Sequence, residues 1–234
     1  MLYAQFVEQE SSWSHIQALQ FIVVKYGAPL AFYTDSHSIF RYVRGRDQRH
    51  MSFDKFTDEV DPQWKQVIKD CNVQPIYALS PQAKSKIAPP FGWLQDHLIR
   101  TCMRENVKNI QHAQRILNYG RDHYNYKQFH STTKKIPSRR FNSALEAKKS
   151  SFRPWLIPPP FLSIRDIFAL RTSRFVDNYL SVTIQNLHIK LSDVEPISPV
   201  DIRIYILEHN FYGSSDFVVQ EKQRFIDANR SLKT

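Results

Sequence analysis

Hydrophobic positions recur every three or four residues in several stretches of residues 1–126, which is the spacing of a helix with one buried face. The clearest stretch starts at Trp13 and stops at Gly27, a residue type that commonly terminates helices. Shorter apolar runs between these stretches predict strands. The predicted helices are Trp13–Tyr26, Pro62–Cys71, Phe91–Cys102 and Ala113–Tyr124, and the predicted strands are Leu2–Val7, Pro29–Tyr33 and Gln74–Leu79. This part of the chain is therefore predicted to be an α/β domain.

The pattern changes after residue 126. Residues 127–154 are poor in hydrophobic periodicity and rich in lysine and arginine. Pro154 and the run Pro158–Pro160 stiffen the chain there. Short apolar runs follow, as in small antiparallel barrels. These predicted strands are Arg174–Asp177, Leu180–Ile184, Leu187–Leu191, Ile202–Leu207 and Asp216–Val219. The sequence thus predicts an α/β domain over 1–126, a basic linker over 127–160, and a small all-β barrel with its tail over 161–234.

The positive charge is concentrated in the middle of the chain. The net charge of +10 arises from residues 80–154, which carry 15 Lys and Arg against 4 Asp and Glu, while the flanking segments are close to neutral. A localised excess attracts phosphate polymers because binding releases condensed counterions. A solvated lysine-rich surface would have the same composition. The concentration of the positive charge in one segment instead favours a nucleic acid as the binding partner.

Cysteine content and hydropathy indicate the compartment. Cys71 and Cys102 are too few for a disulfide scaffold and lack the spacing of a metal site. The first residues lack the features of a signal peptide, and no apolar run is long enough to cross a bilayer. We therefore expect a cytoplasmic protein with reduced thiols and no membrane partner.

Two segments resemble the catalytic core of DDE-type insertion-sequence transposases of the integrase superfamily. Leu30–Phe40 (LAFYTDSHSIF) is similar to their second-aspartate segment, and Tyr77–Ile87 followed by Phe91–Asp96 is similar to their glutamate segment. Further similarities lie at Tyr124–Asn125, Asp166–Phe168 and Arg174–Val176. The resemblance implies a partial ribonuclease-H-like integrase core, a C-terminal SH3-like barrel, and a function in DNA integration and transposition.

The chain departs from this family at two of its three catalytic carboxylates. The resemblance begins at the third strand of the family's core, so the strand that carries the first aspartate is missing. The chain is therefore expected to be truncated and degenerate. Ala88 stands where the family has its glutamate, which leaves Asp35 as the remaining member of the triad.

This loss bears directly on the reaction. The family transfers phosphoryl groups with Mg²⁺ or Mn²⁺, using two ions ~3.5–4 Å apart. Such hard cations require several convergent oxygen ligands, and Asp35 alone cannot hold two of them. We therefore expect an incomplete metal site, no bound cofactor and no catalysis. The alternative explanation for an isolated Asp35 is that its side chain caps a turn. The histidines, His37 included, do not have the spacing of a set of metal ligands.

The basic residues of the middle segment are the candidate contacts to double-stranded DNA. Contacts from such residues to phosphates position a duplex without reading its sequence. Tyr124 and Tyr126 are candidates for stacking on bases, although packing is the more common role. A soluble linker would explain the same charges. The candidates are Lys84 and Lys86 beside the former catalytic site, and Lys127, Lys134, Lys135, Arg139, Arg140, Lys148, Lys149 and Arg153 in the linker.

Three functions are compatible with this sequence. A decayed transposase would bind DNA without cutting it. An interaction protein would pair with a full-length transposase or repress it, and open strand edges also favour a homo-oligomer. A nuclease would recruit ligands that the motifs do not identify. Magnesium-dependent cleavage separates the third function from the others, and a pull-down with a full-length transposase separates the second from the first.

Overall fold

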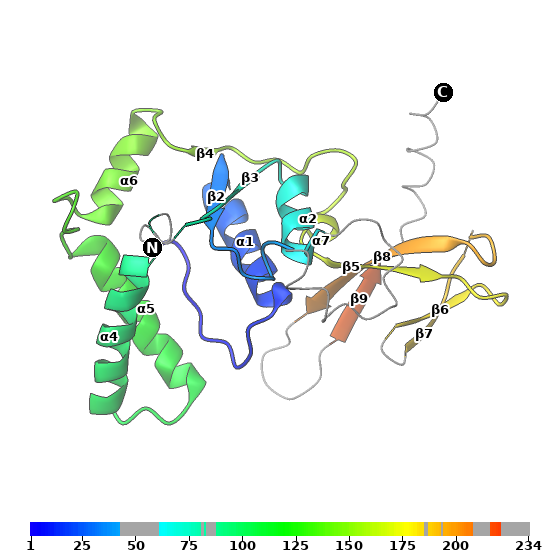
Figure 1. The fold of residues 1–234 in the computed structure, drawn as a ribbon, viewed down its shortest axis with the longest axis horizontal. Helices are drawn as coiled ribbons and strands as arrows, with labels where there is room; N and C mark the ends of the chain where they lie inside the picture. Colours follow the sequence, from blue (N-terminus) through cyan, green and yellow to red (C-terminus); the bar gives the residue numbers. More distant parts are fainter. Residues whose placement is uncertain are drawn as a thin grey trace. The chain divides into compact units, whose positions relative to one another are not determined.

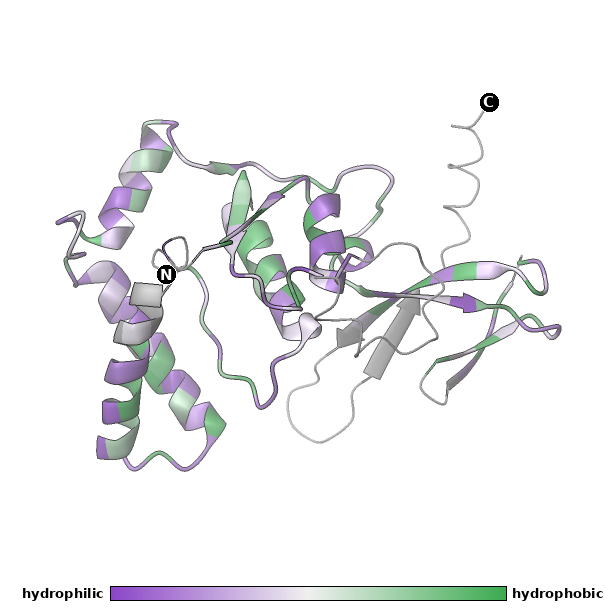
Figure 2. Ribbon diagram, in the orientation of Figure 1, coloured by the Kyte–Doolittle hydropathy of each residue, from purple (hydrophilic) through white to green (hydrophobic). Residues whose placement is uncertain are grey.

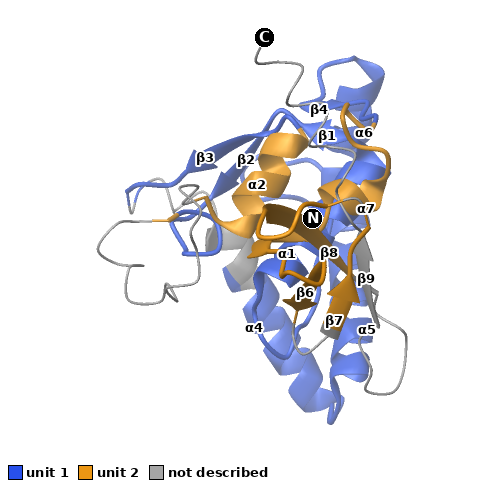
Figure 3. Ribbon diagram, turned by 90° about the vertical axis from the view of Figure 1, so that its right-hand side faces the viewer, with its two compact units in different colours: residues 1–41, 72–156 blue, residues 42–71, 157–234 orange. Residues whose placement is uncertain are grey.

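The computed structural model describes residues 1–42, 61–80, 82, 88–184, 187–192, 194–207 and 216–220 (Figure 1). These residues form helices and small sheets, which confirms an α/β protein. Two compact units divide the chain, unit 1 comprising 1–41 and 72–156 and unit 2 comprising 42–71 and 157–234 (Figure 3). The finer predictions of a ribonuclease-H-like core, an SH3-like barrel and the domain boundaries stay predictions.

The first helix of unit 1 is α1, Ser12–Tyr26, close to its predicted bounds. Ser11 and Ser14 form a capping box at its start, which satisfies backbone N–H groups of the first turn. The helix ends at Gly27, where φ is +92° and only glycine avoids strain. Hydrophobic residues colour much of α1 in Figure 2. Its buried residues are Trp13, Ile16, Leu19 and Val23.

Two small sheets follow in unit 1. β2, Ala31–Thr34, pairs in parallel with β3, Gln74–Tyr77. β1, Ala28–Pro29, pairs antiparallel with β4, Phe152–Arg153, which joins chain segments more than 120 residues apart. Because a Cβ on Gly27 would lie 2.3 Å from the Arg153 carbonyl oxygen, this pairing needs glycine at position 27. The β1–β4 pair ties the end of the basic segment to the end of α1.

The predicted strand at Leu2–Val7 is wrong, since residues 1–7 have no strand structure. Amide side chains of a helix supply partners for this backbone instead. Gln114 accepts from the Phe6 N–H at 2.8 Å, and the Asn125 side chain donates to the Met1 carbonyl at 2.7 Å. An alternating pattern cannot distinguish these partners from a neighbouring strand.

Helices α4, α5 and α6 also belong to unit 1. α4, Ala88–Arg104, and α5, Ile110–Tyr126, confirm the predicted helices and lie side by side (Figure 1). Leu98 and Leu117 are buried, and a Cβ on Gly120 would lie 3.7 Å from the His97 ring. α6, Pro137–Glu146, forms inside the segment that the sequence predicts to be a basic linker, where the sequence predicts no helix.

Unit 2 confirms the predicted helix near residues 62–71 and four of the five predicted strands. The first predicted strand, Arg174–Asp177, is displaced, because the observed strand runs from Leu170 to Phe175. Strand β8 lies between β5 and β9 in a three-stranded antiparallel sheet, and β6 pairs with β7 in a hairpin. A buried apolar cluster that includes Val182 and Ile202 forms the core. The elements are α2 (Gln63–Asp70), α7 (Ile164–Ile167), β5 (Leu170–Phe175), β6 (Ser181–Ile184), β7 (Leu187–Lys190), β8 (Pro199–Leu207) and β9 (Asp216–Gln220).

No helix within the described ranges combines the length and apolar character needed to span a membrane.

Candidate nucleic-acid interface

Asp35, the predicted catalytic carboxylate, directly follows strand β2. Its Oδ1 accepts a hydrogen bond from the backbone N–H of His37 at 3.1 Å, and the ring of His37 in turn accepts from the Ile39 N–H at 3.4 Å. These bonds close a short turn, in which Asp and Asn side chains commonly accept from the backbone two residues on. The geometry at Asp35 is therefore that of a turn cap.

The remaining parts of the predicted catalytic site do not join Asp35 in a donor set. α4 begins at Ala88, which offers no ligand, and Lys84 and Lys86 lie outside the described residues. Within the part of the chain that is described, no three His, Cys, Asp or Glu side chains gather as metal ligands would. These residues do not fit the oxygen-rich site that a pair of hard divalent ions requires.

The linker cations have a more definite arrangement, which begins with a closed turn after α5. The Nδ1 atom of His130 accepts from the backbone N–H groups of Thr132 and Thr133 at 3.2 and 3.4 Å. The backbone of Lys134 donates to the His130 carbonyl, and that of His130 donates to the Lys135 carbonyl. Lys134 has a φ of +52°. This bonding fixes the backbone that presents the exposed side chains of Lys134 and Lys135.

Helix α6 starts immediately after this turn, with Pro137 in its first position. Arg139 and Arg140 occupy its first turn, which contains no acidic residue and has no side-chain cap. The helix dipole favours anions at this end, and a cation there costs about 0.3–1 kcal/mol. Two arginines therefore oppose the local preference, and such conflicts are expected where function requires them.

A second turn closes the other end of α6. The backbone N–H of Lys148 donates to the Leu145 carbonyl at 3.0 Å, and that of Lys149 donates to the Ala144 carbonyl at 2.9 Å. Lys148 takes the left-handed conformation, with a φ of +54°. The turn reverses the chain so that Lys149 lines the same pocket as the start of α6.

These elements enclose a pocket of about 380 Å³, which we call the α6 pocket. It brings together five of the predicted contacts, and all five side chains are exposed. None of them pairs with a carboxylate among the residues that the structure describes. The segment 127–156 holds eight Lys and Arg against the single acid Glu146. The five cations are Lys134, Lys135, Arg139, Arg140 and Lys149.

The α6 pocket is anchored on unit 1 by an aromatic cluster. Phe141 projects from α6 and packs edge-on against Tyr26 of α1 and Phe152 of β4, with ring centroids 6.1 and 5.8 Å apart. Edge-to-face pairs at such distances stabilise packing beyond the burial of their area. The β1–β4 pair holds Phe152 in place. Packing of aromatic rings, rather than helical propensity, therefore positions this short helix.

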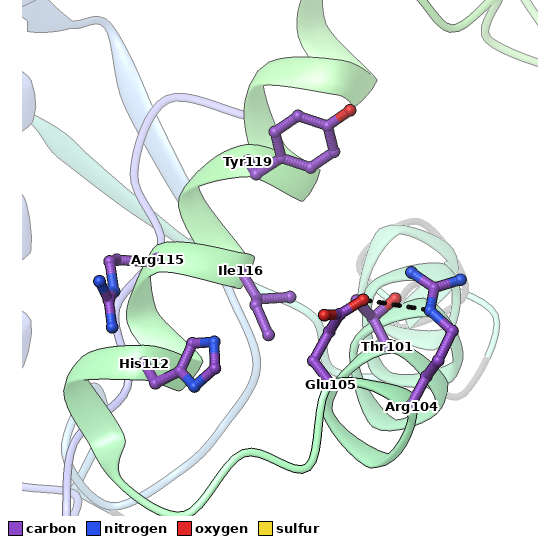
Figure 4. A pocket seen from close by; sticks show the side chains of 7 residues that line it. All are labelled: Thr101, Arg104, Glu105, His112, Arg115, Ile116 and Tyr119. Atoms are coloured by element: carbon purple, nitrogen blue, oxygen red, sulfur yellow. Dashed lines mark hydrogen bonds and ion pairs between the residues drawn. The ribbon is translucent and has the colours of Figure 1, made fainter.

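A second pocket in unit 1, of about 400 Å³ between α4 and α5, has different electrostatics (Figure 4). Its walls include Arg104 and Arg115, but Glu105 also lines it and pairs with Arg104 at 3.2 Å. Figure 4 shows this ion pair beside Thr101, facing Ile116 of α5. The α4–α5 pocket thus contains its own counterion, whereas the described residues that line the α6 pocket include no acid.

The other predicted contacts lie outside the α6 pocket. Lys127 caps the end of α5, and Lys148 occupies the turn after α6. The Arg153 side chain donates to the Asn72 carbonyl oxygen, which engages it within unit 1. Tyr126 is 65% exposed, whereas Tyr124 is half-buried.

Sequence reasoning missed Phe129, which lines the α6 pocket together with the cations. Its side chain is 66% exposed although it is fully apolar. A signal was present in the sequence, because Phe129 is the one apolar residue in the basic and polar stretch from Lys127 to Lys135. Which cations lie around it depends on α6, and the sequence did not predict that helix.

Comparison with known proteins points to one class. No protein-family model matches the chain. It is 27% identical over 195 residues to a protein of Sinorhizobium fredii (strain NBRC 101917 / NGR234) described as "Putative transposase y4bF". The aligned region covers 83% of this chain but 38% of that protein, so the chain spans well under half of its relative's length. The similarity supports a relation of this chain to transposases.

Proposed function

We propose that this protein is a transposase-like protein of the DNA integration and transposition class that binds double-stranded DNA through the α6 pocket without cutting it. The observation that carries the proposal is the set of five exposed cations with no carboxylate partner among the described residues. Gathering like charges costs free energy, which a polyanionic ligand offsets. The similarity to a transposase makes DNA the polyanion to test first.

Phosphate groups are the chemistry that this surface fits. Arginine offers a planar fork of donors that matches phosphate oxygens, and lysine acts as a compact point charge. An anion near Arg139 and Arg140 would also relieve their conflict with the helix dipole. Contacts of this kind hold a duplex with little regard to its sequence.

The absence of cutting is part of the same proposal. Asp35 accepts a backbone hydrogen bond in a turn, and Ala88 replaces the glutamate of the family that the sequence resembles. A ribonuclease-H-like core that lacks two of three carboxylates would retain a scaffold for DNA but not the ligands for two metal ions. Magnesium-dependent nicking that disappears in Asp35→Ala would contradict this part. Ala88→Glu alone is expected to restore no activity.

Duplex binding over a salt series tests the proposal. If about six phosphates are neutralised, the plot of log affinity against log salt should have a slope of about −5. Replacing Lys134, Lys135, Arg139 and Arg140 with glutamine should flatten this slope by about 3–4 units. Unrelated duplexes should bind with similar affinity.

A matched variant controls for net charge. Arg100, Arg104, Lys108 and Arg115 are exposed residues of α4, α5 and their connection, and their replacement by glutamine removes the same four charges. This control should change the slope by less than about one unit. Equal effects of the two variants would show that DNA responds to total charge and not to the α6 pocket. Unchanged binding in the α6 variant would refute the proposal.

A further inference from the structure

Phe129 lies among cations in the α6 pocket and has an uncovered ring. Its side chain is 66% exposed, and it makes no ring–ring or cation–ring contact with any residue that the structure describes. Single exposed apolar residues are common and need no explanation by themselves. Phe129 differs because it forms the pocket wall together with Lys134, Lys135 and Arg139. A flat apolar ring and several cationic side chains that can bind phosphate therefore line the same pocket.

The other residues that line the α6 pocket add further apolar surface and one polar group. Ile136, Ala144 and Ala147 add apolar surface, and Ser143 adds one hydroxyl group. The volume of about 380 Å³ falls within the range of ~300–1,000 Å³ typical of pockets for small ligands. A ligand that fills this cavity must carry an apolar planar part and a strong negative charge close together. A nucleotide unit has both, in its base and its phosphate.

The partner must expose the face of a base. Inside a duplex each base is stacked on its neighbours, so an aromatic side chain reaches a base face at the lowest cost at an unpaired nucleotide. Stacking of bases on aromatic side chains tolerates any base because every base has a π-face. An acidic peptide with an aromatic residue would offer similar groups, but the relation to transposases favours nucleic acid.

We infer that the α6 pocket is a subsite for one unpaired nucleotide of a DNA strand next to the bound duplex. Its base stacks on Phe129, and its phosphate is held by the surrounding lysines and arginines. This inference rests on the proposed function, because the duplex next to the unpaired nucleotide is held by the same cationic surface. Because of this subsite, the protein should bind duplexes with frayed or single-stranded ends more tightly than blunt duplexes, whatever their sequence.

Fluorescence anisotropy with two labelled probes tests the inference. Both are the same duplex with a short single-stranded tail. One tail carries thymine bases, and the other is abasic, with the same number of phosphates. The wild-type protein should bind the thymine-tailed duplex about tenfold more tightly, within the range measured for stacking of one base. The abasic tail removes any difference that arises from charge.

Substitutions at position 129 complete the test. Phe129→Ala should abolish the preference for the thymine tail, while Phe129→Trp should keep it because the larger ring also stacks. Neither change alters a charge, so both variants should keep the salt slope of the wild type on a blunt duplex. Phe175→Ala is the matched control, since Phe175 is 64% exposed and lies outside the pocket. It should leave the preference intact.

The outcomes separate this inference from the proposed function. Equal affinity of the wild type for both tails, or a preference that survives Phe129→Ala, would overturn the subsite and leave duplex binding standing. No salt-dependent binding of any duplex would overturn the proposed function itself. Circular dichroism of each variant verifies that an altered preference does not arise from unfolding.

Discussion

The molecule contains two clusters of positive charge that are built in opposite ways. In unit 2, Arg171 and Arg203 share the carboxylate of Asp70, at 2.6 and 3.4 Å. In unit 1, the five cations of the α6 pocket are exposed and have no carboxylate among the described residues. The first cluster is electrostatically compensated within the fold, whereas the second is left for a ligand to compensate.

Burial is the physical reason for this difference. Arg203 is 8% exposed, and its guanidinium lies 4.8 Å from the centre of the Phe161 ring. Burial lowers the pKa of Arg171 to about 10, although the attraction of Asp70 opposes that shift. Removing charge from water is costly unless a partner is supplied. Exposed cations carry no such cost, so the absence of partners around α6 leaves them available to phosphate.

The largest expected effect on stability comes from breaking the compensated cluster. Asp70→Asn keeps the shape of the side chain but removes the carboxylate that Arg171 and Arg203 share. Because the cluster is largely but not fully buried, the free energy of unfolding should fall by about 2–3 kcal/mol. Urea denaturation measures this change. The control Asp96→Asn breaks the exposed Arg100–Asp96 pair and should cost less than about 0.5 kcal/mol. Equal costs would contradict the contrast between buried and exposed charge.

Reversing charge in the uncompensated cluster should affect binding instead. The double variant Arg139→Glu and Arg140→Glu should weaken duplex binding by on the order of 100-fold near physiological salt. Its stability should not fall, because acidic residues suit the first turn of α6. The same reversal at Arg104 and Arg115, which line the α4–α5 pocket, should have a much smaller effect on affinity. Comparable losses in the two double variants would remove the distinction between these pockets.

A substitution in the aromatic cluster around Phe141 tests the position of α6 independently of its charge. Phe141→Ala removes the ring that packs against Tyr26 and Phe152, and should lower the stability of the protein by about 2 kcal/mol. Duplex affinity should also fall although every cation remains. Tyr119→Ala, at a position 70% exposed, should change stability by no more than about 0.5 kcal/mol. Full duplex affinity in the Phe141 variant would show that the cations work without a fixed helix.

The smallest expected effect concerns the β1–β4 strand pair, which ties the end of the basic segment to the end of α1. Gly27→Ala places a Cβ 2.3 Å from the Arg153 carbonyl oxygen at a φ of +92°, and should cost about 1–2 kcal/mol. Gly92→Ala is a suitable contrast, because a Cβ there meets nothing within 4 Å and alanine favours a helix. Thermal melting should show opposite shifts for the two variants. An unchanged melting temperature in Gly27→Ala would mean that the β1–β4 pair does not hold the basic segment that contains α6.

Local sequence patterns predicted those elements whose buried residues recur at regular spacing within one short stretch of the chain. α1 shows this, because Ile16, Leu19 and Val23 recur at helical spacing and Gly27 ends the run. α6 escaped prediction because the ring contacts of Phe141 are with residues 26 and 152, far from it in the sequence. Residues 1–7 were predicted as a strand, since alternation does not reveal that Gln114 and Asn125 bind their backbone.

The candidate site was predictable in composition but not in arrangement. The concentration of charge in residues 80–154 pointed to the basic segment as a whole. Two closed turns select five of its cations, because the bonds at His130 and the reversal at Lys148 orient the backbone on either side of α6. Arg153 looked equivalent in the sequence, yet its side chain donates to the backbone of Asn72.

Lysine footprinting shows directly whether a DNA duplex occupies the α6 pocket. The protein is acylated with and without a blunt duplex at low salt, and mass spectrometry compares modification at each lysine. Lys134, Lys135 and Lys149 should be protected by the duplex, and added salt should abolish that protection. Lys108 and Lys190, which are also exposed but lie outside the α6 pocket, should react equally in both samples. Equal modification of the three pocket lysines with and without bound duplex would contradict the account.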